Sequence, residues 1–159
     1  QGTVEEFKVD FTPEDMNVTI KEVVKDTKKA VDITEAKVLV SGGRGIGSPE
    51  FFGELKKVAD LLGGEISSSR ANVDAGWIER DRQVGQTGKT VRPELYMACG
   101  ISGAIQHIAG MENSECVIAI NKNDTAAIFE VSDLGIVGDV KVIIPKLAEA
   151  LEKYKAENN

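Results

Sequence analysis

Residues Pro93–Met111 read PELYMACGISGAIQHIAGM, an apolar run that ends in a Gly/Ser turn and continues into apolar residues at helical spacing. We predict a strand over 94–99 and a helix over 102–109. Such a turn points the unpaired backbone N–H groups and the positive dipole of a helix N-terminus at an anion. We expect Gly100 and Gly103 to let that anion approach the backbone closely.

The same alternation of strand and helix recurs through most of the chain. Further strands are predicted over residues 37–40, 65–68, 116–120 and 134–137. Near-continuous apolar strands that alternate with helices are typical of a parallel sheet covered on both faces. The sequence therefore predicts an α/β fold with a mainly parallel sheet.

Two further helices complete this pattern. The first is predicted to start at Ser48 as the N-cap, with Pro49 in its first turn, and to end at Gly63-Gly64. Its apolar face comprises Phe51, Phe52, Leu55, Val58, Ala59, Leu61 and Leu62. The second follows Gly138-Asp139 at the C-terminal end. Its residues that share a face are Ile143, Leu147, Ala150, Leu151 and Tyr154.

Residues 1–35 are less regular and are expected to form an N-terminal strand and linker region. Their loosely alternating apolar residues are Phe7, Val9, Phe11, Val18 and Ile20. They predict an edge strand or two, followed by a charged connector. The main domain is then expected over residues 36–159.

Composition narrows the class of protein. The 159 residues, 42% of them hydrophobic, suffice for one domain with a core. A formal net charge of −7 argues against a nucleic-acid partner, because phosphate backbones require a basic surface. No apolar run is long enough to span a bilayer and no signal-peptide pattern is present, so no membrane insertion is expected.

The two cysteines, Cys99 and Cys116, lie in apolar segments without C-x-x-C spacing. Buried free thiols in a reducing compartment are the expected state. With a single histidine and no Cys/His cluster, the sequence does not predict a zinc site.

Several polar positions are ambiguous when they are considered one at a time. The loop at 42–47 follows a strand and precedes a helix, but its G-x-G-x-G spacing is not the dinucleotide fingerprint, and a tight turn is the alternative. Arg44 in this loop and Arg70 would face a ligand at the carboxyl edge of a parallel sheet, although Arg70 could be a solvated charge. His107 could be a satisfied helix histidine, and Asn121 a turn residue. No hydrolytic constellation is evident.

Taken together, the motifs resemble the FAD-binding domain of the electron transfer flavoprotein α subunit. The resemblance covers residues from about 36 to the end. It is carried, in the family's order, by SGGRG at 41–45, SRANVDAG at 69–76, VGQTG at 84–88, the stretch 93–111, and AINK at 119–122 with Ile128-Phe129. Cys99 departs from the family, which usually has an aliphatic residue there. The family's additional N-terminal domain has no counterpart here, so we expect an isolated FAD-binding domain.

The resemblance implies a Rossmann-like (DHS-like NAD/FAD-binding) three-layer fold and an FAD site. It places the pyrophosphate at residues 100–105, on Ser102, Gly103, Ala104 and Ile105. It places the ribose and adenine near Asn121 and the segment Gly138, Asp139 and Val140. The residues implied around the isoalloxazine ring are Arg44, Ser69, Arg70, Val84, Gly85, Gln86, Thr87, Gly88, Gln106 and His107.

The implied function is that of an electron carrier and not of an enzyme with its own substrate. His107 and Arg70 are expected to favour the anionic flavin semiquinone, and Thr87 to bond near flavin N5. The implied partners are an electron transfer flavoprotein β subunit, as a heterodimer, and acyl-CoA or other dehydrogenases, with a connection to fatty acid β-oxidation. We expect a bacterial cytoplasmic location ahead of the mitochondrial matrix. An NAD- or CoA-binding oxidoreductase module of similar fold is the alternative.

Overall fold

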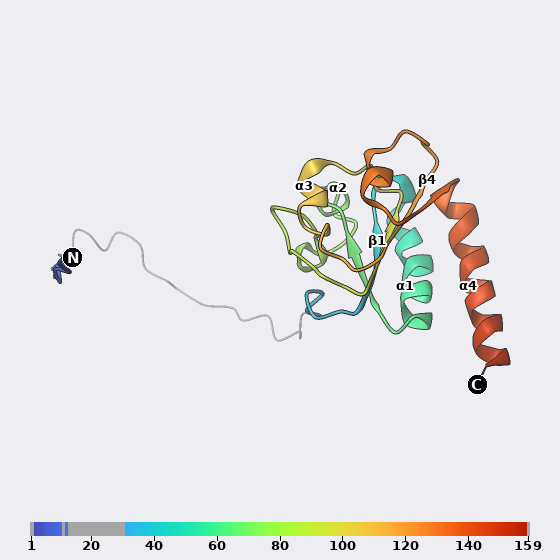
Figure 1. Cartoon of the computed structure of the whole chain (residues 1–159), viewed down its shortest axis with the longest axis horizontal. Coiled ribbons are helices and arrows are strands. Elements are labelled where there is room, and N and C mark those ends of the chain that lie inside the picture. Colours follow the sequence, from blue (N-terminus) through green and yellow to red (C-terminus); the bar gives the residue numbers. More distant parts are fainter. Residues whose placement is uncertain (1, 11, 13–30, 159) are drawn as a thin grey trace.

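The structure is a computed structural model that describes residues 2–10, 12 and 31–158 (Figure 1). Its centre is a five-stranded sheet in the order β2-β1-β3-β4-β5, in which every neighbouring pair is parallel. The strands are β1 (Val38–Gly42), β2 (Glu65–Ser68), β3 (Leu95–Cys99), β4 (Val117–Asn121) and β5 (Leu134–Val137). The predicted α/β fold with a parallel sheet is confirmed.

The strand order changes direction between β1 and β3. The chain goes from β1 outward to β2 and then returns to the other side of β1 to form β3. In open parallel sheets such a switch point leaves a crevice beyond the carboxyl ends of the two strands. The loops after β1 and β3, which are two of the glycine-containing motifs of the sequence, therefore meet at this crevice.

Two long helices cover one face of the sheet and lie side by side (Figure 1). They are α1 (Phe52–Leu61) and α4 (Val140–Glu157), and both pack on an apolar cluster that includes Val40, Met97 and Ile120. All seven residues predicted for the apolar face of α1 belong to this cluster.

Both helices also correct details of the prediction. The first begins as a 3-10 turn, η3 (Pro49–Phe51), and the Ser48 side chain makes no N-cap hydrogen bond. In α4, Ile143, Leu147 and Leu151 pack against the core as predicted, but Ala150 and Tyr154 are exposed. The buried residues of α4 are Val140, Ile144 and Ala148, because its contact stripe is rotated toward α1.

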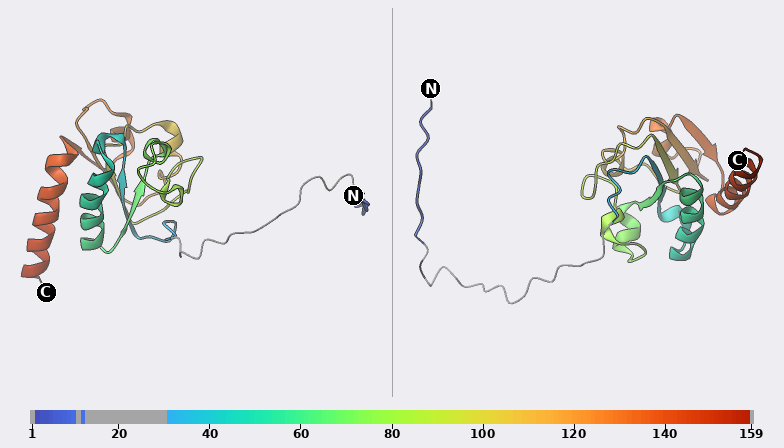
Figure 2. Two further views of the ribbon diagram at one scale, coloured as in Figure 1. Left: turned by 180° about the vertical axis from the view of Figure 1, so that it is seen from behind. Right: turned by 90° about the horizontal axis from the view of Figure 1, so that it is seen from below.

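Short helices and long loops cover the opposite face, as the views in Figure 2 show. The short elements outside the α1 and α4 face are α2 (Arg70–Asp74), α3 (Ile105–Ile108) and the 3-10 turns η4 (Arg80–Arg82) and η5 (Ala127–Val131), whereas the turn η2 (Arg44–Ile46) contacts α4 and buries Ile46 in the cluster beneath α1 and α4. The predicted helix over 102–109 is therefore too long. Its first residues stay extended, since Gly103 has a positive φ of 88° and Ala104 has φ −59° and ψ 141°.

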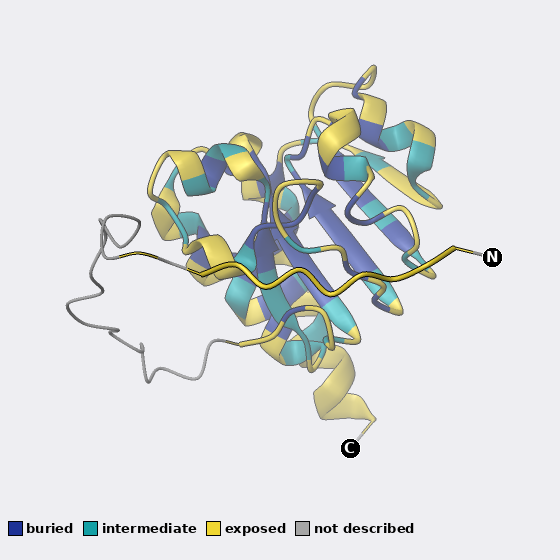
Figure 3. Cartoon of the chain, turned by 90° about the vertical axis from the view of Figure 1, so that its left-hand side faces the viewer, coloured by how far each residue is buried: buried dark blue, intermediate teal, exposed yellow. Residues whose placement is uncertain are grey.

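Burial in Figure 3 is concentrated in the strands, while the C-terminal end of α4 is exposed. Cys99 is buried in β3, and burial raises the pKa of its thiol to about 12. Cys116 precedes β4 and is only half-buried, so the prediction of a buried thiol is wrong there. Its position just outside the strand leaves it at the surface rim.

Only part of the prediction for residues 1–35 can be compared with the structure. Residues 2–10 and 12 form no strand, so the strand expected at Phe7 and Val9 is wrong, and both side chains are exposed. Phe11, Val18 and Ile20 lie outside the described residues. Over residues 2–10, 12 and 31–158, no helix has both the length and the apolar character that crossing a bilayer requires.

Candidate functional site: a cavity at the carboxyl edge of the sheet

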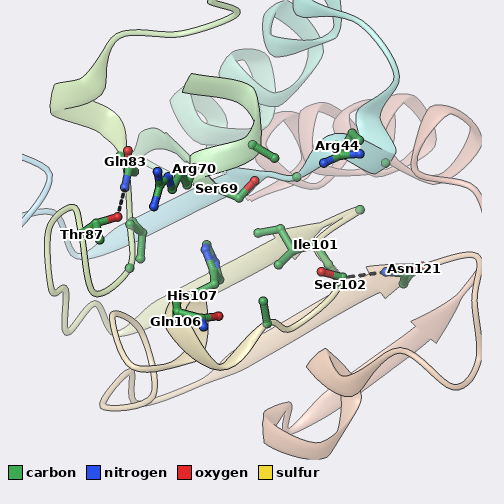
Figure 4. A pocket seen from close by; sticks show the side chains of 17 residues that line it. Arg44, Ser69, Arg70, Gln83, Thr87, Ile101, Ser102, Gln106, His107 and Asn121 are labelled. Atoms are coloured by element: carbon green, nitrogen blue, oxygen red, sulfur yellow. Dashed lines mark hydrogen bonds between the residues drawn. The ribbon is translucent and has the colours of Figure 1, made fainter. Parts of the chain in front are cut away.

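A cavity of about 590 Å³ opens at the switch point between β1 and β3 (Figure 4). The carboxyl ends of these strands, the start of α2, the loop at 83–87 and the start of α3 surround it. The residues that line it are Gly43, Arg44, Gly45, Ser69, Arg70, Ala71, Gln83, Val84, Gly85, Thr87, Gly100, Ile101, Ser102, Ala104, Gln106, His107 and Asn121. The size suits a ligand larger than a single nucleotide base.

Glycines allow the two loops that form the floor of the cavity to pack backbone against backbone. A Cβ added at Gly43 would lie 2.3 Å from the Gly100 carbonyl oxygen, and Gly43 N–H bonds to the Cys99 carbonyl at 2.9 Å. At Gly103, a Cβ would lie 2.1 Å from Ile128 N. The missing Cβ atoms of Gly100 and Gly103 therefore make room for protein backbone, and the expectation that an anion also approaches these residues stays a prediction.

The turn after β3 nevertheless offers unused donors to the cavity. Within the described part of the chain, the backbone N–H groups of Ser102, Gly103, Ala104 and Ile105 donate to no backbone carbonyl. Ser102 and Ala104 are exposed and line the cavity. Successive free N–H groups on an exposed turn can bind the oxygens of a phosphate group.

Charge in the cavity is opposite to that of the whole chain. Arg44 and Arg70 line it and no carboxylate does, although the chain carries a net charge of −7. Arg70 pairs with Asp74 (Nε–Oδ2 3.2 Å), whereas Arg44 takes part in no ion pair among the described residues. A cavity of this kind attracts an anionic ligand.

A buried amide fixes the position of α2 and hence of Arg70. The Asn72 side chain is fully buried and donates through Nδ2 to the Gly42 carbonyl at 3.0 Å. Ser68 Oγ and Ser69 N–H donate to the same carbonyl. These three bonds tie the start of α2 to the end of β1, which explains the polar SRAN motif at the end of a core strand.

The loop at 83–88 contributes a hydroxyl whose direction is set by a neighbour. Gln83 is 4% exposed and donates from Nε2 to Thr87 Oγ1 at 2.9 Å. Because Thr87 Oγ1 accepts this bond, its own proton is available to an acceptor in the cavity. The backbone of Gln86 donates to the Gln106 carbonyl at 2.7 Å and joins the loop to α3.

His107 is buried, at 6% exposure, and is bonded to Tyr96 on the strand below it. Tyr96 Oη and His107 Nε2 are 2.9 Å apart, while Nδ1 has no partner among the described residues. Burial lowers the pKa of His107 to about 4, against a smaller upward effect of the Val84 carbonyl. The ring is therefore neutral at pH 7, and a ligand would find a neutral imidazole in this wall.

A smaller cavity of about 30 Å³ adjoins the first one beyond Asn121. Asn121 lines both cavities, and Lys122, Asp139 and Val140 line only the smaller one. Asn121 is a structural link as well, since Nδ2 donates to the Ile101 carbonyl and Oδ1 accepts from Asn123 N–H, both at 2.9 Å. Asp139 caps α4 by accepting from Lys141 N–H at 2.9 Å.

Most of the predicted site residues meet in these two cavities. Those that line the larger cavity are Arg44, Ser69, Arg70, Val84, Gly85, Thr87, Ser102, Ala104, Gln106, His107 and Asn121. Gln86, Gly88, Gly103 and Ile105 line neither cavity, and Ile105 is 77% exposed.

Four lining residues were not among those predicted for the site, namely Gly43, Gly45, Ala71 and Gln83, although the two glycines belong to the loop at 42–47 that the sequence singled out. Gln83 directly precedes the VGQTG motif, but nothing in its neighbours signals that it is buried. Gln83 reaches the cavity because the fold brings it beside Ser68 at the end of β2, a contact between segments that are distant in the sequence.

The switch-point cavity, the two arginines and the free N–H groups are typical of the open α/β domains that bind anionic, nucleotide-like ligands. A family model described as "Electron transfer flavoprotein FAD-binding domain" matches residues 32–112. The chain belongs to this family, the electron transfer flavoprotein α subunits, and the predicted membership is confirmed.

Curated relatives are similar over nearly the whole chain. The α subunit of the electron transfer flavoprotein from Thermoanaerobacterium thermosaccharolyticum is 55% identical over 97% of this chain and 47% of its own length. The corresponding subunit from Clostridium acetobutylicum is 53% identical over 98% and 46%. The acryloyl-CoA reductase electron transfer subunit beta of Anaerotignum propionicum is 48% identical over 92% and 41%. The chain thus spans about half the length of these relatives.

Proposed function

We propose that the chain binds FAD in the larger cavity and carries electrons between a dehydrogenase and a second redox partner. The observation that supports this most is the coincidence of two arginines, a neutral unpartnered histidine nitrogen and free backbone N–H groups around one cavity. FAD carries a pyrophosphate and a polar ring system that need donors of these kinds.

The two parts of the site suit the two halves of the cofactor. The pyrophosphate would be held by the turn at Ser102–Ile105, where the N–H groups are unused. Ribose and adenine would lie toward Asn121 and the smaller cavity with Asp139 and Val140. Gln86, Gly88, Gly103 and Ile105 remain in the proposal as backbone that shapes the loops rather than as lining side chains.

The isoalloxazine ring would then lie among the residues at the other end of the cavity. Bound flavin supplies one- and two-electron redox chemistry. Arg70 provides positive charge there, His107 a neutral polar edge, and Thr87 a hydroxyl proton held in place by Gln83. Donors that favour negative charge on the ring would favour the anionic semiquinone. Each tenfold preference corresponds to about 59 mV for one electron.

The partners and the setting are also proposals. Since the relatives named above are electron transfer flavoprotein α subunits or an electron transfer subunit of acryloyl-CoA reductase, we propose a β subunit as heterodimer partner and an acyl-CoA or other dehydrogenase as electron donor. A role in fatty acid β-oxidation, a carrier function without substrate turnover, and a bacterial cytoplasmic location belong to the same proposal.

The test is to identify the ligand. The purified chain is examined by visible absorption and by mass spectrometry of its heat-released ligand, and the ligand-free chain is titrated separately with FAD, NAD and CoA. We expect flavin absorption or quenching of FAD fluorescence, with one FAD per chain. Binding of NAD or CoA in preference to FAD would contradict the proposal and favour an oxidoreductase module of similar fold.

A further inference from the structure

Beneath the cavity, a hydroxyl-rich polar cluster lies on the loop-covered face of the sheet. Tyr96 on β3 is fully buried, and its neighbours on that face include Ser41 on β1 and Ser67 on β2, also fully buried. Ser41 pairs in register with both Ser67 and Ala98, so these side chains alternate onto the same face as Tyr96. A buried tyrosine with several polar neighbours in an otherwise apolar core requires an explanation.

The direction of the hydrogen bond between Tyr96 and His107 depends on where their protons lie. Burial raises the pKa of Tyr96 and lowers that of His107 to about 4, so the phenol keeps its proton and the imidazole is neutral. A neutral imidazole has one donor and one acceptor nitrogen. Across the 2.9 Å contact, either Tyr96 donates to Nε2, or Nε2–H donates to the phenol oxygen.

The other polar groups around Tyr96 favour the first arrangement. The hydroxyls of Ser41 and Ser67 make no hydrogen bond in the described chain, and the hydrogen-bond partner of Tyr96 Oη is His107 Nε2. A buried phenol proton without an acceptor is costly, so this proton is directed to Nε2. The imidazole proton must then be on Nδ1.

The surroundings of Nδ1 leave its proton unused. Nδ1 is buried and has no hydrogen-bond partner in the described chain, and His107 lines the larger cavity. A proton on Nδ1 is therefore available to an acceptor of a bound ligand.

We propose that Tyr96 is a positioning residue that holds His107 as the neutral Nδ1–H tautomer, so that the wall of the cavity carries a hydrogen-bond donor without a positive charge. The functional part of this inference rests on the proposed FAD site. A neutral donor stabilises negative charge on a bound ring less strongly than a cation would, which leaves Arg44 and Arg70 as the charged groups of the cavity.

The single histidine of the chain makes the tautomer directly measurable. Long-range ¹H–¹⁵N NMR of the ligand-free chain at pH 7 should show one imidazole, with Nδ1 protonated and Nε2 bare. In Tyr96→Phe the bond that selects this tautomer is lost, and both nitrogens should shift toward the averaged values of a tautomer mixture. Ser67→Ala, which removes a hydroxyl from the same cluster but keeps the Tyr96–His107 bond, should retain the Nδ1–H spectrum.

Two results would overturn the inference: a protonated Nε2 with a bare Nδ1 in the unmodified chain, or an unchanged spectrum in Tyr96→Phe. Because the NMR measurement uses no FAD, failure of the proposed function would show separately as a lack of FAD binding. In chain loaded with FAD, Tyr96→Phe should reduce the stabilisation of the one-electron-reduced flavin by up to tenfold, about 59 mV. Ser67→Ala should leave this reduction potential unchanged.

Discussion

The two faces of the sheet are built on different physical principles. Helices α1 and α4 cover one face through an entirely apolar cluster, in which Val58 and Ile144 are fully buried. The other face also buries an apolar cluster, with Leu39, Ala98 and Ile128 among its members, but adds Ser41, Ser67 and His107 beneath loops and short helices. Apolar burial stabilises the first face without regard to direction, whereas polar groups on the second are useful only in one arrangement. The difference indicates that apolar burial stabilises both faces, while the loop face also carries the buried polar groups around the site.

The largest effect expected on the loop face is that of Gly103→Ala. A Cβ there would lie 2.1 Å from Ile128 N, and the backbone has a positive φ of 88°. We expect urea unfolding to show a loss of about 3 kcal/mol or more, because backbone must move on both sides. Gly63→Ala at the end of α1, with φ 68° but open space around it, should cost only about 1 kcal/mol. Equal losses would contradict the packing role of Gly103.

The buried histidine predicts a specific pH dependence of stability. The pKa of His107 is about 4 in the folded chain and 6.5 ordinarily. Between pH 4 and pH 6.5, the unfolded chain therefore binds a proton at His107 that the folded chain does not bind. The free energy of unfolding should therefore fall as the pH drops from 6.5 to 4, by roughly 3 kcal/mol. Urea titrations across this range measure the slope.

The control for this slope is His107→Gln, which has no imidazole to titrate. Because the chain has no other histidine, its slope above pH 5 should be nearly flat. Exposed carboxylates such as Asp32 and Glu50, whose pKa values are lowered by hydrogen bonds, lose their contribution only at lower pH. The same slope in both proteins would show that His107 is not held neutral.

These outcomes also indicate which features could be foreseen from the sequence. Hydrophobic periodicity identified all five strands and the apolar face of α1, because burial leaves a direct mark on residue type. The length of α3 was overestimated because the conformation of Gly103 and Ala104 is set by contact with η5, a distant segment.

In the site, too, some residues could be predicted from the sequence, whereas others depend on contacts that only the fold creates. Motif residues such as Arg44, Arg70 and His107 were placed at the cavity from a family resemblance, and the structure brings them together. Gln83 was missed because its function depends on a bond to Thr87 within a folded loop. The Tyr96–His107 pair was missed because a tyrosine in an apolar strand is indistinguishable in sequence from a core aromatic.

Charge on the loop face should affect the redox potential more than it affects stability. Arg70 is exposed and pairs only with Asp74 in this structure, so Arg70→Ala should leave folding intact and retain FAD. Loss of its charge should lower the first reduction potential by roughly 60 to 120 mV and reduce the semiquinone yield. Reductive titration with spectroelectrochemistry measures both, with the exposed Arg92→Ala as control. An unchanged potential and yield would remove Arg70 from the site.

The smallest effect is expected from Gln83→Leu, which removes the amide that orients Thr87. Loss of one neutral hydrogen bond should weaken FAD binding by up to about tenfold, or about 1.4 kcal/mol. Thr87→Val should give a loss of similar size, and the double variant should add little, because both changes break the same interaction. Full additivity in FAD titrations would show that Gln83 acts independently of Thr87.

The most direct test of the division between the faces is FAD binding by two matched variants. Ala104→Glu places a carboxylate on the exposed turn that lines the cavity, and Ala150→Glu places one on the exposed side of α4. Titration of FAD, followed by the quenching of its fluorescence, should give one site per chain in the unmodified protein and in Ala150→Glu. Binding should be at least tenfold weaker in Ala104→Glu. Absence of FAD binding in the unmodified chain, or equal affinities for the two variants, would contradict the account.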